Sequence, residues 1–419
     1  MKRPELLLPA GSKEKLDYAI QYGADAVYLG MVDFSLRAMR KGELITLDNL
    51  KDCIDLAHSF GKKVYLTLNI FAYSNDIDQM IECAERINDA NPDAILFSDF
   101  GVYNVIRKYM SNIPIHVSTQ TNILNYEAVK FWQDMGAERV VLSRDLSLKQ
   151  IEEIKNKVPG MELEVFVHGA QCVSFSGRCL ISDYMTKGER KANHGNCSQS
   201  CRWSYKLVEE SREGELFDIQ QNERGTHILS PKDLALINYL PQLIDVGVDS
   251  FKIEGRTKSL YYVSAVAKAY RKAIDEYLTT GKINEEANYE EIRKIGNRGY
   301  TTGFYLHKPD SEGYSYDISK GLAGADCLCV FMDKDEKGFK VLTKNKFLLN
   351  DEIEIITPDE CFKATVIKIT DEKGKEKEVS NTNDESWLEL SQGPKNFKYA
   401  LARTIGVKNV RWYLNQTIM

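Results

Sequence analysis

The sequence predicts an α/β protein that begins with a (β/α)8 TIM-like barrel and continues into a small antiparallel β-barrel domain. Eight short apolar runs occur between residues 5 and 255, and segments with helical periodicity separate them. After residue 285 the pattern changes to short alternating strands with turn-type separators such as DKDEKG. An open doubly wound sheet is the alternative for the first part. That fold usually carries a glycine-rich phosphate loop after its first strand, and PAGSKEK is a poor match to such a loop.

The predicted elements alternate regularly along the chain. The eight strands are expected at 5–9, 26–30, 63–69, 94–99, 114–119, 139–143, 163–168 and 250–255. The helical segments are expected at 13–22, 47–60, 78–87, 126–135, 148–157 and 232–244. Glycine follows a helical segment in GADAVYLG, GKKVYLTLN, GAERVVLS and GVDSFKIEG, where a left-handed helix cap is needed. Ser230 and Pro231 predict the start of the last helix, with serine as N-cap and proline in the first turn.

The predicted domain division follows from these patterns. Residues 1–284 form the barrel, including a cysteine-rich insertion over 169–229, and residues 285–419 form the C-terminal β-rich domain. The insertion leaves about sixty residues between the seventh strand and the next helix, which is long for a loop in a compact domain. A loop of this length is expected to be functional or internally stapled.

Composition limits the class of protein. The chain has 419 residues and a net charge of −6, which argues against general polyanion binding through the overall field. No apolar run reaches the eighteen or so residues of a membrane helix, and Pro9 and Gly11 interrupt the apolar start, so a cytoplasmic protein without a membrane segment is expected. Nine cysteines, an odd number, do not suggest a disulfide framework in such a protein.

Four cysteines lie close together in the insertion, at Cys172, Cys179, Cys197 and Cys201. The other five stand in helix-like or strand-like patterns and are expected to be small buried side chains. The spacing C-x6-C-x17-C-x3-C departs from the usual zinc knuckles, whereas iron–sulfur clusters also use four thiolates and tolerate varied spacing. A metal site is therefore expected, with an iron–sulfur cluster slightly favoured and zinc as the alternative.

The carboxyl ends of the predicted strands place polar side chains at one mouth of the barrel, where TIM-barrel active sites lie. These residues are Asn69, Asp99, Gln120, Asn122, Arg144, His168, Glu254 and Arg256. Arg144 and Arg256 suit the binding of carboxylates, because a guanidinium pairs with a carboxylate through two hydrogen bonds. A structural salt bridge with Glu254 is the alternative reading of either arginine. We expect catalytic roles for His168, Glu254, Arg144, Arg256 and Asp99, and substrate contacts from Asn69, Gln120 and Asn122.

The insertion also interleaves basic and aromatic residues against an acidic background. Arg190, Lys191, Arg202 and Trp203 are the residues expected to contact a nucleic acid there. A charged, solvated loop without a nucleic-acid partner is the alternative.

One segment resembles the signature of the U32 peptidase family, the collagenase-like proteases. The matching residues are Glu164, Phe166, Gly169, Ala170, Cys172, Gly177, Cys179 and Ser182. The resemblance extends along nearly the whole chain, through ELLLPAGS, STQTNILN, GNCSQSCR, FKIEGRTKS and NRGYTTGFY. Chains with this extended architecture resemble the bacterial proteins needed for prephenate-dependent 5-hydroxylation of the wobble uridine of tRNA. The resemblance thus implies a [4Fe-4S] cluster on the four cysteines of the insertion, with prephenate as co-substrate and tRNA as partner; a second subunit of the same family is a further partner to test.

Two other functions remain open at the level of the sequence. The family name implies proteolysis, but the chain has no H-E-x-x-H or G-x-S-x-G motif. A serine–histidine pair stays open, since Ser118, Ser143 and His168 are all expected at the same mouth. The second alternative is a metal-stapled RNA-binding scaffold without chemistry of its own, which a mouth rich in converging polar groups disfavours.

Overall fold

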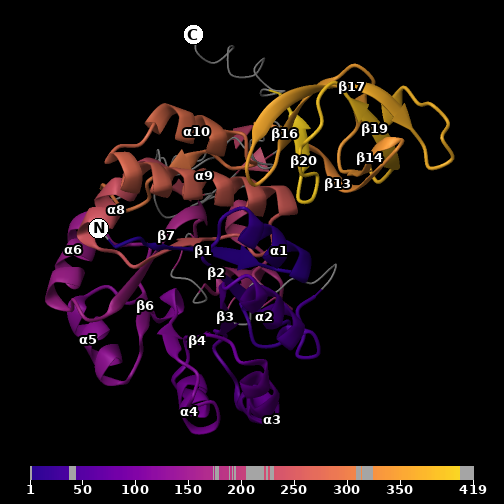
Figure 1. The fold of residues 1–419 in the computed structure, drawn as a ribbon. Helices are drawn as coiled ribbons and strands as arrows, with labels where there is room; N and C mark the ends of the chain where they lie inside the picture. The colour runs from indigo at the N-terminus through magenta and orange to yellow at the C-terminus, as the bar shows by residue number, and fades with distance from the viewer. Residues whose placement is uncertain are drawn as a thin grey trace.

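The computed structural model (Figure 1) describes most of the chain, namely residues 2–36, 44–172, 174, 179–187, 189–190, 192, 195–203, 221–222, 225–226, 231–307, 313 and 324–405. Within these residues, eight parallel strands close into a barrel, as the sequence predicts. They are β1 (Glu5–Ala10), β2 (Ala26–Gly30), β3 (Lys63–Leu68), β4 (Ala94–Phe97), β5 (Ile115–Val117), β6 (Arg139–Val141), β7 (Glu162–Ala170) and β11 (Ser250–Ile253). Strand β11 pairs in parallel with both β1 and β7, which closes the barrel.

Helices surround the barrel and cover its outer apolar faces (Figure 1). They are α1 (Lys13–Gln21), α2 (Leu50–Ser59), α3 (Ser74–Ala90), α4 (Phe100–Tyr109), α5 (Tyr126–Asp134), α6 (Leu148–Lys157), α8 (Leu240–Val246), α9 (Leu260–Thr280) and α10 (Glu285–Arg293). Polar caps fix several helix starts. For example, the Ser12 hydroxyl accepts from the Lys15 amide at 3.3 Å, and Asn125 caps α5 through the Ala128 amide at 3.0 Å. Helix α4, whose N-cap is Asp99, is absent from the helical segments predicted above.

The predicted helix over 232–244 is wrong in its first half. Residues Asp233–Ala235 form strand β10, which pairs antiparallel with the end of β7, and a 3-10 turn follows at Ile237–Tyr239 before α8 begins. The proline in the first turn of α8 is Pro241 and not Pro231; Ser230 lies outside the described residues. The reason is tertiary: β7 runs beyond the barrel to Ala170, and its extended edge offers backbone groups that a strand satisfies and a helix does not.

The insertion between β7 and β10 contains little regular structure among its described residues. Helix α7 (Ile181–Met185) and the 3-10 turn η3 (Ser200–Arg202) contact each other, and two short strands, β8 (Gln221–Asn222) and β9 (Gly225–Thr226), pair with each other. The Ser182 hydroxyl, fully buried, donates to the Arg190 carbonyl at 2.7 Å and accepts from the Ser198 amide at 2.8 Å. This serine of the signature therefore braces the insertion.

The second unit is a closed antiparallel barrel of six strands within the described residues, which confirms the predicted C-terminal β-barrel. Its strands are β13 (Cys327–Asp335), β14 (Gly338–Thr343), β16 (Glu352–Ile356), β17 (Cys361–Thr370), β19 (Glu385–Leu390) and β20 (Leu401–Thr404). Short strands β15 (Phe347–Leu348) and β18 (Val379–Ser380) pair beside it. The barrel has a core of its own that includes Phe331, Val341 and Leu388.

The two units pack against each other beside α1 and α9 (Figure 1). The Tyr22 hydroxyl of the first unit lies 3.0 Å from the Ile356 carbonyl and 2.8 Å from the Tyr399 carbonyl. Arg403 of β20 is almost fully buried and pairs with Glu354 at 2.6 Å and with Glu291 of α10 at 2.9 Å. Ile292 of α10 belongs to the same core cluster as the first barrel, and so do Val330 and Ile356 of the second barrel. The expected division at residue 285 stays a prediction. The described strands of the second barrel begin only at Cys327.

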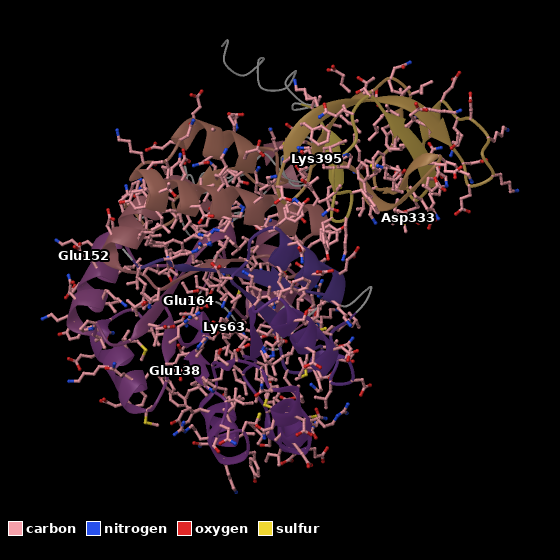
Figure 2. All side chains as sticks on the ribbon, viewed as in Figure 1. Lys63, Glu138, Glu152, Glu164, Asp333 and Lys395 are labelled. Atoms are coloured by element: carbon pink, nitrogen blue, oxygen red, sulfur yellow. The ribbon has the colours of Figure 1, made fainter. Side chains whose placement is uncertain are left out.

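Charged residues fill the lower part of the first barrel's interior. Glu164 is fully buried among the strands (Figure 2) and lies 3.2 Å from Arg139 and 2.7 Å from Lys252. Arg139 also pairs with Glu5 at 2.6 Å and with Glu162 at 2.7 Å. This charged column connects the bottom of the barrel with the pocket described below. No described helix is long and apolar enough to cross a membrane.

Candidate active site at the barrel mouth

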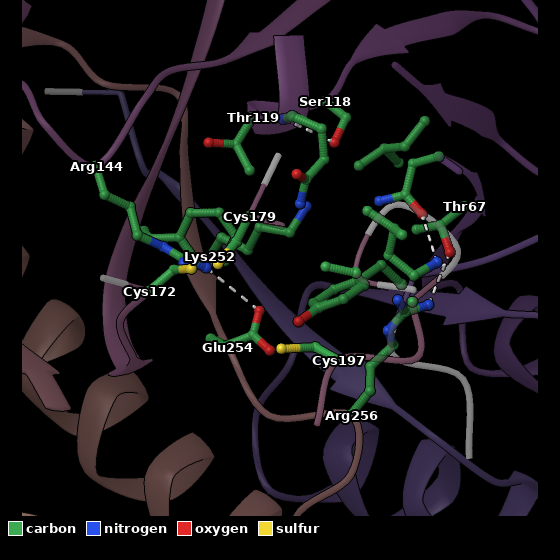
Figure 3. Close-up of a pocket in the computed structure, with 18 residues that line it drawn as sticks. Thr67, Ser118, Thr119, Arg144, Cys172, Cys179, Cys197, Lys252, Glu254 and Arg256 are labelled. Atoms are coloured by element: carbon green, nitrogen blue, oxygen red, sulfur yellow. Dashed lines mark hydrogen bonds and ion pairs between the residues drawn. The ribbon is translucent and has the colours of Figure 1, made fainter. Parts of the chain in front are cut away.

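A pocket opens at the carboxyl ends of the barrel strands and is partly covered by the insertion (Figure 3). It holds about 780 Å³ of space, its open mouth included. The lining residues come from several strands and from the insertion: Tyr28, Leu36, Thr67, Asn69, Leu96, Ser118, Thr119, Gln120, Arg144, Phe166, Cys172, Cys179, Ala192, Gly195, Cys197, Lys252, Glu254 and Arg256. The location agrees with the site expected from the sequence, because side chains at the ends of parallel strands converge on one face of a barrel.

Arg144 and Glu254 form an ion pair across one side of the pocket, with the Arg144 Nη2 atom 3.4 Å from Glu254 Oε2 (Figure 3). The Arg144 guanidinium also lies over the Phe166 ring, 3.9 Å from its centroid. Both partners of the ion pair are largely buried. The salt bridge that was the alternative reading of this arginine is therefore present, and the long contact leaves the guanidinium within reach of a further anion.

Arg256 lies on the opposite side of the pocket and is almost fully buried. Its Nη1 donates to the Ser35 hydroxyl at 2.8 Å and to the Thr67 hydroxyl at 2.7 Å. Gly30, at the end of β2, makes room for this arrangement, because a Cβ there would collide with the Arg256 guanidinium and with the Ser35 side chain. The glycine is thus required by the close approach of a charged side chain.

Lys252 is a pocket residue that is absent from the site predicted from the sequence. It is nearly fully buried, its Nζ donates to Glu164 Oε1 at 2.7 Å, and it lies 4.4 Å from the centroid of the Tyr28 ring. Burial lowers its pKa, although the charge of Glu164 opposes this effect. Alternation along β11 and beyond places Lys252, Glu254 and Arg256 on the same side, and that period-two signal was available in FKIEGR.

Asn69 and Gln120, for which the sequence predicts substrate contacts, also line the pocket. The Asn69 Oδ1 accepts from the Leu36 amide at 3.1 Å, which fixes the orientation of its side chain. The Oε1 of Gln120 is buried and has no hydrogen-bond partner among the described residues. A buried acceptor without a partner is costly, so this oxygen is suited to a donor group of a ligand.

Of the eight polar residues expected at the barrel mouth, three are not among the lining residues. Asp99 caps α4 by accepting from the Gly101 amide at 2.8 Å and the Val102 amide at 3.1 Å, and Asn122 ends the 3-10 turn η1 (Thr119–Thr121) in a left-handed conformation. In both cases a local side-chain or backbone requirement accounts for the residue.

His168 is the third of these residues. Its ring packs among those of Tyr262, Tyr270 and Tyr300, and its Nδ1 lies 3.2 Å from the Tyr270 hydroxyl oxygen. Burial lowers its pKa to about 3, so the ring is neutral at physiological pH. A register shift between β7 and β11 explains the orientation: Phe166 pairs with Lys252, but His168 pairs with Ile253. This bulge reverses the alternation and places His168 on the side facing the helices.

Three of the four insertion cysteines, Cys172, Cys179 and Cys197, line the pocket (Figure 3). Figure 3 draws these three cysteines around the same pocket as Arg144 and Glu254. Cys201 is part of the turn η3 and is partly buried. All four are free thiols.

The donor chemistry of this set fits a thiolate-bound metal group. The Cys197 sulfur accepts a hydrogen bond from the Gln199 amide at 3.4 Å, a contact of the kind that tunes the sulfurs of iron–sulfur centres. In the described part of the chain, no three His, Cys, Asp or Glu side chains stand close enough together to hold a single metal ion as they are arranged here.

The residues expected to contact a nucleic acid differ in their structural surroundings. The Arg190 guanidinium binds Asn196 Oδ1 at 3.1 Å and the Cys197 carbonyl at 3.0 Å, so it braces the cysteine segment. Trp203 ends η3 and is exposed. Lys191 and the side chain of Arg202 lie outside the described residues.

Comparison with known proteins places this site in a family. The model of peptidase family U32 matches residues 11–315, and the model of the peptidase family U32 C-terminal domain matches residues 325–403. The chain belongs to peptidase family U32. The two matched regions correspond to the two barrels of the structure, and the first contains every residue that lines the pocket.

Named U32 relatives carry two kinds of description. The chain is 36% identical to tRNA hydroxylation protein P of Escherichia coli, over 94% of this chain and 95% of that protein. It is 37% identical to tRNA hydroxylation protein P1 of Bacillus subtilis, over 90% and 89% of the two chains. It is also 35% identical to a collagenase of Porphyromonas gingivalis, over 72% and 73%. The site must therefore be interpreted from its chemistry as well as from the family.

Proposed function

We propose that this U32 protein is an iron–sulfur enzyme that hydroxylates C5 of the wobble uridine of tRNA in the cytoplasm, with prephenate as co-substrate. The observation that carries the proposal is the convergence of three insertion cysteines with Arg144, Lys252 and Arg256 on one pocket. The similarity to two tRNA hydroxylation proteins over nearly the whole chain supports the same substrate class. A second subunit of the family remains a prediction.

The charges of the pocket suit a small dicarboxylic acid such as prephenate. Among the described lining residues, three cationic side chains stand against the single carboxylate of Glu254. Arg144 and Arg256 lie on different sides of the pocket, so each guanidinium can bind one carboxylate. The buried Oε1 of Gln120 offers an acceptor for a hydroxyl group.

The four insertion cysteines, Cys172, Cys179, Cys197 and Cys201, are the proposed ligands of a [4Fe-4S] cluster. Such a cluster, when bound, supplies one-electron transfer next to the pocket. Arg190 holds the backbone at Cys197, and Ser182 joins the segment around Arg190 to the segment around Ser198. These contacts keep the cysteine segment folded over the pocket mouth.

The insertion also exposes aromatic side chains on which an RNA base can stack. Tyr184 is 82% exposed and Trp203 is 39% exposed, and both belong to the insertion that covers the mouth. Stacking of bases on aromatic side chains contributes about 1 to 3 kcal/mol per base in single-stranded RNA binding. A wobble base, which lies in a single-stranded loop, can reach such a surface without unpairing a duplex.

The geometry does not support the serine–histidine arrangement of a peptidase. His168 faces away from the pocket into three tyrosine rings, whereas Ser118 lines the pocket and caps the turn η1. The Ser143 hydroxyl donates to Asp145 at 2.5 Å. A general base must lie within hydrogen-bond reach of the group that it activates, and His168 is not placed to activate either serine.

The proposal is tested by deleting the gene in its own host and analysing tRNA nucleosides by mass spectrometry. We expect the 5-hydroxyuridine family of modifications to disappear and to return with the wild-type gene. Normal modification in the deletion strain, together with tRNA binding by the purified protein, would instead support the scaffold. Cleavage of gelatin by the pure protein, unaffected by replacement of the insertion cysteines, would support the peptidase.

Gly30→Ala is expected to reduce activity strongly while leaving the fold intact. The added Cβ displaces the Arg256 guanidinium, and misplacing a substrate-binding group by about 1 Å can lower a rate about 100-fold. The measurement is tRNA hydroxylation in the complemented deletion strain. Gly296→Ala is the matched control, because no atom lies within 4 Å of the place that a Cβ would take there. Equal activity of the two variants would show that Arg256 does not position the substrate.

A further inference from the structure

Lys252 lines the pocket together with the two arginines and shares its aromatic neighbours with them. Its Nζ lies 4.4 Å from the centroid of the Tyr28 ring and 5.5 Å from that of Phe166. The same two rings also carry the arginines: Arg256 lies 5.6 Å from the Tyr28 centroid and Arg144 lies 3.9 Å from the Phe166 centroid. The amine of Lys252 therefore shares one aromatic ring with each of the two guanidinium groups.

We propose that Lys252 forms an imine with the keto group of a 2-oxo acid bound in this pocket. This inference deepens the proposed function and rests on it, because prephenate is a 2-oxo acid with a second carboxylate. The position of the lysine, and not its pairing with Glu164, points to this reaction. A buried amine that lines an open pocket can be reached by a bound ligand. The two arginines set the positions of the carboxylates of that ligand.

Orientation supports attack on the keto carbon. In a 2-oxo acid the keto carbon is bonded directly to one carboxylate, so a guanidinium that binds this carboxylate brings the keto carbon close to a neighbouring amine. Arg144 and Arg256 each share an aromatic ring with Lys252, so binding at either arginine satisfies this requirement. The aromatic walls also keep water away from the amine, since Lys252 is only 4% exposed.

The reaction balances with the groups of the pocket and one co-reactant, the 2-oxo acid. Glu164 Oε1, 2.7 Å from Nζ, accepts the ammonium proton and leaves a neutral amine. The amine lone pair forms a bond to the keto carbon while the carbonyl π electrons move to oxygen, and one proton passes from the nitrogen to that oxygen to give a neutral carbinolamine. The hydroxyl takes up a second proton and leaves as water while the nitrogen lone pair forms the C=N bond, and loss of the last N–H proton gives the neutral imine. The net change is amine plus ketone to imine plus water, without oxidation or reduction.

The low exposure of Lys252 assists the first step, because burial lowers its pKa relative to a lysine in water. The amine is therefore deprotonated more readily than a lysine side chain in water. This difference makes a selective chemical test possible.

The test is reductive trapping of the purified full-length protein. Prephenate and sodium cyanoborohydride are added at neutral pH, and intact mass followed by peptide mapping locates the adduct. We expect a reduced adduct on Lys252 in the wild type, and none with the 2-hydroxy acid that lacks the keto group. Lys258→Arg, which changes a nearby lysine that does not line the pocket, should label like the wild type, whereas Lys252→Arg should lose the adduct.

Each outcome decides between the alternatives. Labelling spread over surface lysines, unchanged in Lys252→Arg, overturns the proposal, as does the absence of an adduct on Lys252 in the wild type. If Lys252→Arg does not fold, peptide mapping of the wild type alone still locates or excludes the adduct. Trapping needs neither tRNA nor iron, so it can succeed even if the proposed function is wrong. If the purified protein forms the adduct on Lys252 but deletion of its gene leaves tRNA modification intact, the hydroxylase is refuted and the imine is retained. Normal tRNA hydroxylation by Lys252→Arg would refute a role for the imine in that reaction and retain the hydroxylase.

Discussion

Cells that carry Cys197→Ser in place of the wild-type protein are expected to lose the 5-hydroxyuridine modifications of their tRNA. Cys197 lines the pocket, and its sulfur accepts from the Gln199 amide, so it belongs to the proposed cluster site and not to the hydrophobic core. Changing a residue that merely supports a metal ligand typically costs about 10- to 100-fold, and removal of a thiolate ligand itself should cost more. The modification should therefore fall by about 100-fold or more.

The measurement combines nucleoside mass spectrometry with iron and sulfide analysis of anaerobically purified protein. Cys361→Ser is the matched control, because Cys361 is exposed and lies in the second barrel. We expect the control to keep both the modification and the metal. Stoichiometric zinc in a colourless wild-type protein, or full modification in Cys197→Ser, would remove the iron–sulfur centre from the proposal.

Arg139→Met is expected to destabilise the protein by about 3 to 5 kcal/mol, the usual cost of removing one partner of a buried ion pair. Arg139 is 4% exposed and binds Glu5, Glu162 and Glu164, of which Glu164 is fully buried. Without the guanidinium, the two innermost carboxylates lose a charge that compensates for their burial. The measurement is the midpoint of thermal unfolding at a fixed scan rate, since a chain of this size need not unfold reversibly.

Arg86→Met is the matched control, because Arg86 pairs with Asp48 at 2.6 Å where both side chains are more than half exposed. An exposed pair contributes about 1 kcal/mol or less, so the control should unfold close to the wild type. A midpoint for Arg139→Met equal to that of Arg86→Met would show that the charged column is not a stabilising element.

Acidification should narrow the difference between Arg139→Met and the wild type. Burial raises the pKa of Glu5, but the charge and hydrogen bonds of Arg139 outweigh it and hold the pKa below its ordinary value of 4.5. A carboxylate with a lowered pKa contributes stability above its unfolded pKa, and that contribution is lost as the pH falls through the folded value. The wild type should therefore lose more stability than the variant below about pH 4.

Lys252 links the charged column to the pocket. Glu164 joins the charged column at the bottom of the barrel to the pocket at its mouth, because it contacts both Arg139 and Lys252. A change at Arg139 thus acts on the pocket through a single carboxylate. A barrel interior is usually filled by branched apolar side chains, whereas here the charged column takes their place.

Much of the site was predictable because strand ends and cysteine spacing are local features. The eight barrel strands follow from apolar runs, and Asn69, Gln120, Arg144, Glu254 and Arg256 follow from their positions just beyond those strands. Lys252 could have been included by extending the alternation from Glu254 back by two residues. The cysteines stood out because they are clustered in a segment poor in core residues.

Local patterns of side chains were enough to predict the two barrels and the barrel mouth on which the polar residues converge. Both features depend on periodic patterns of apolar and polar residues that span only a few neighbouring positions. The orientation of His168 toward the tyrosines and the strand at residues 233–235 emerged only from the folded chain. Both features arise on β7, where a bulge reverses the side-chain alternation and an extended edge recruits a distant segment. Such pairing depends on backbone groups far apart in the chain, which no local pattern of side chains encodes.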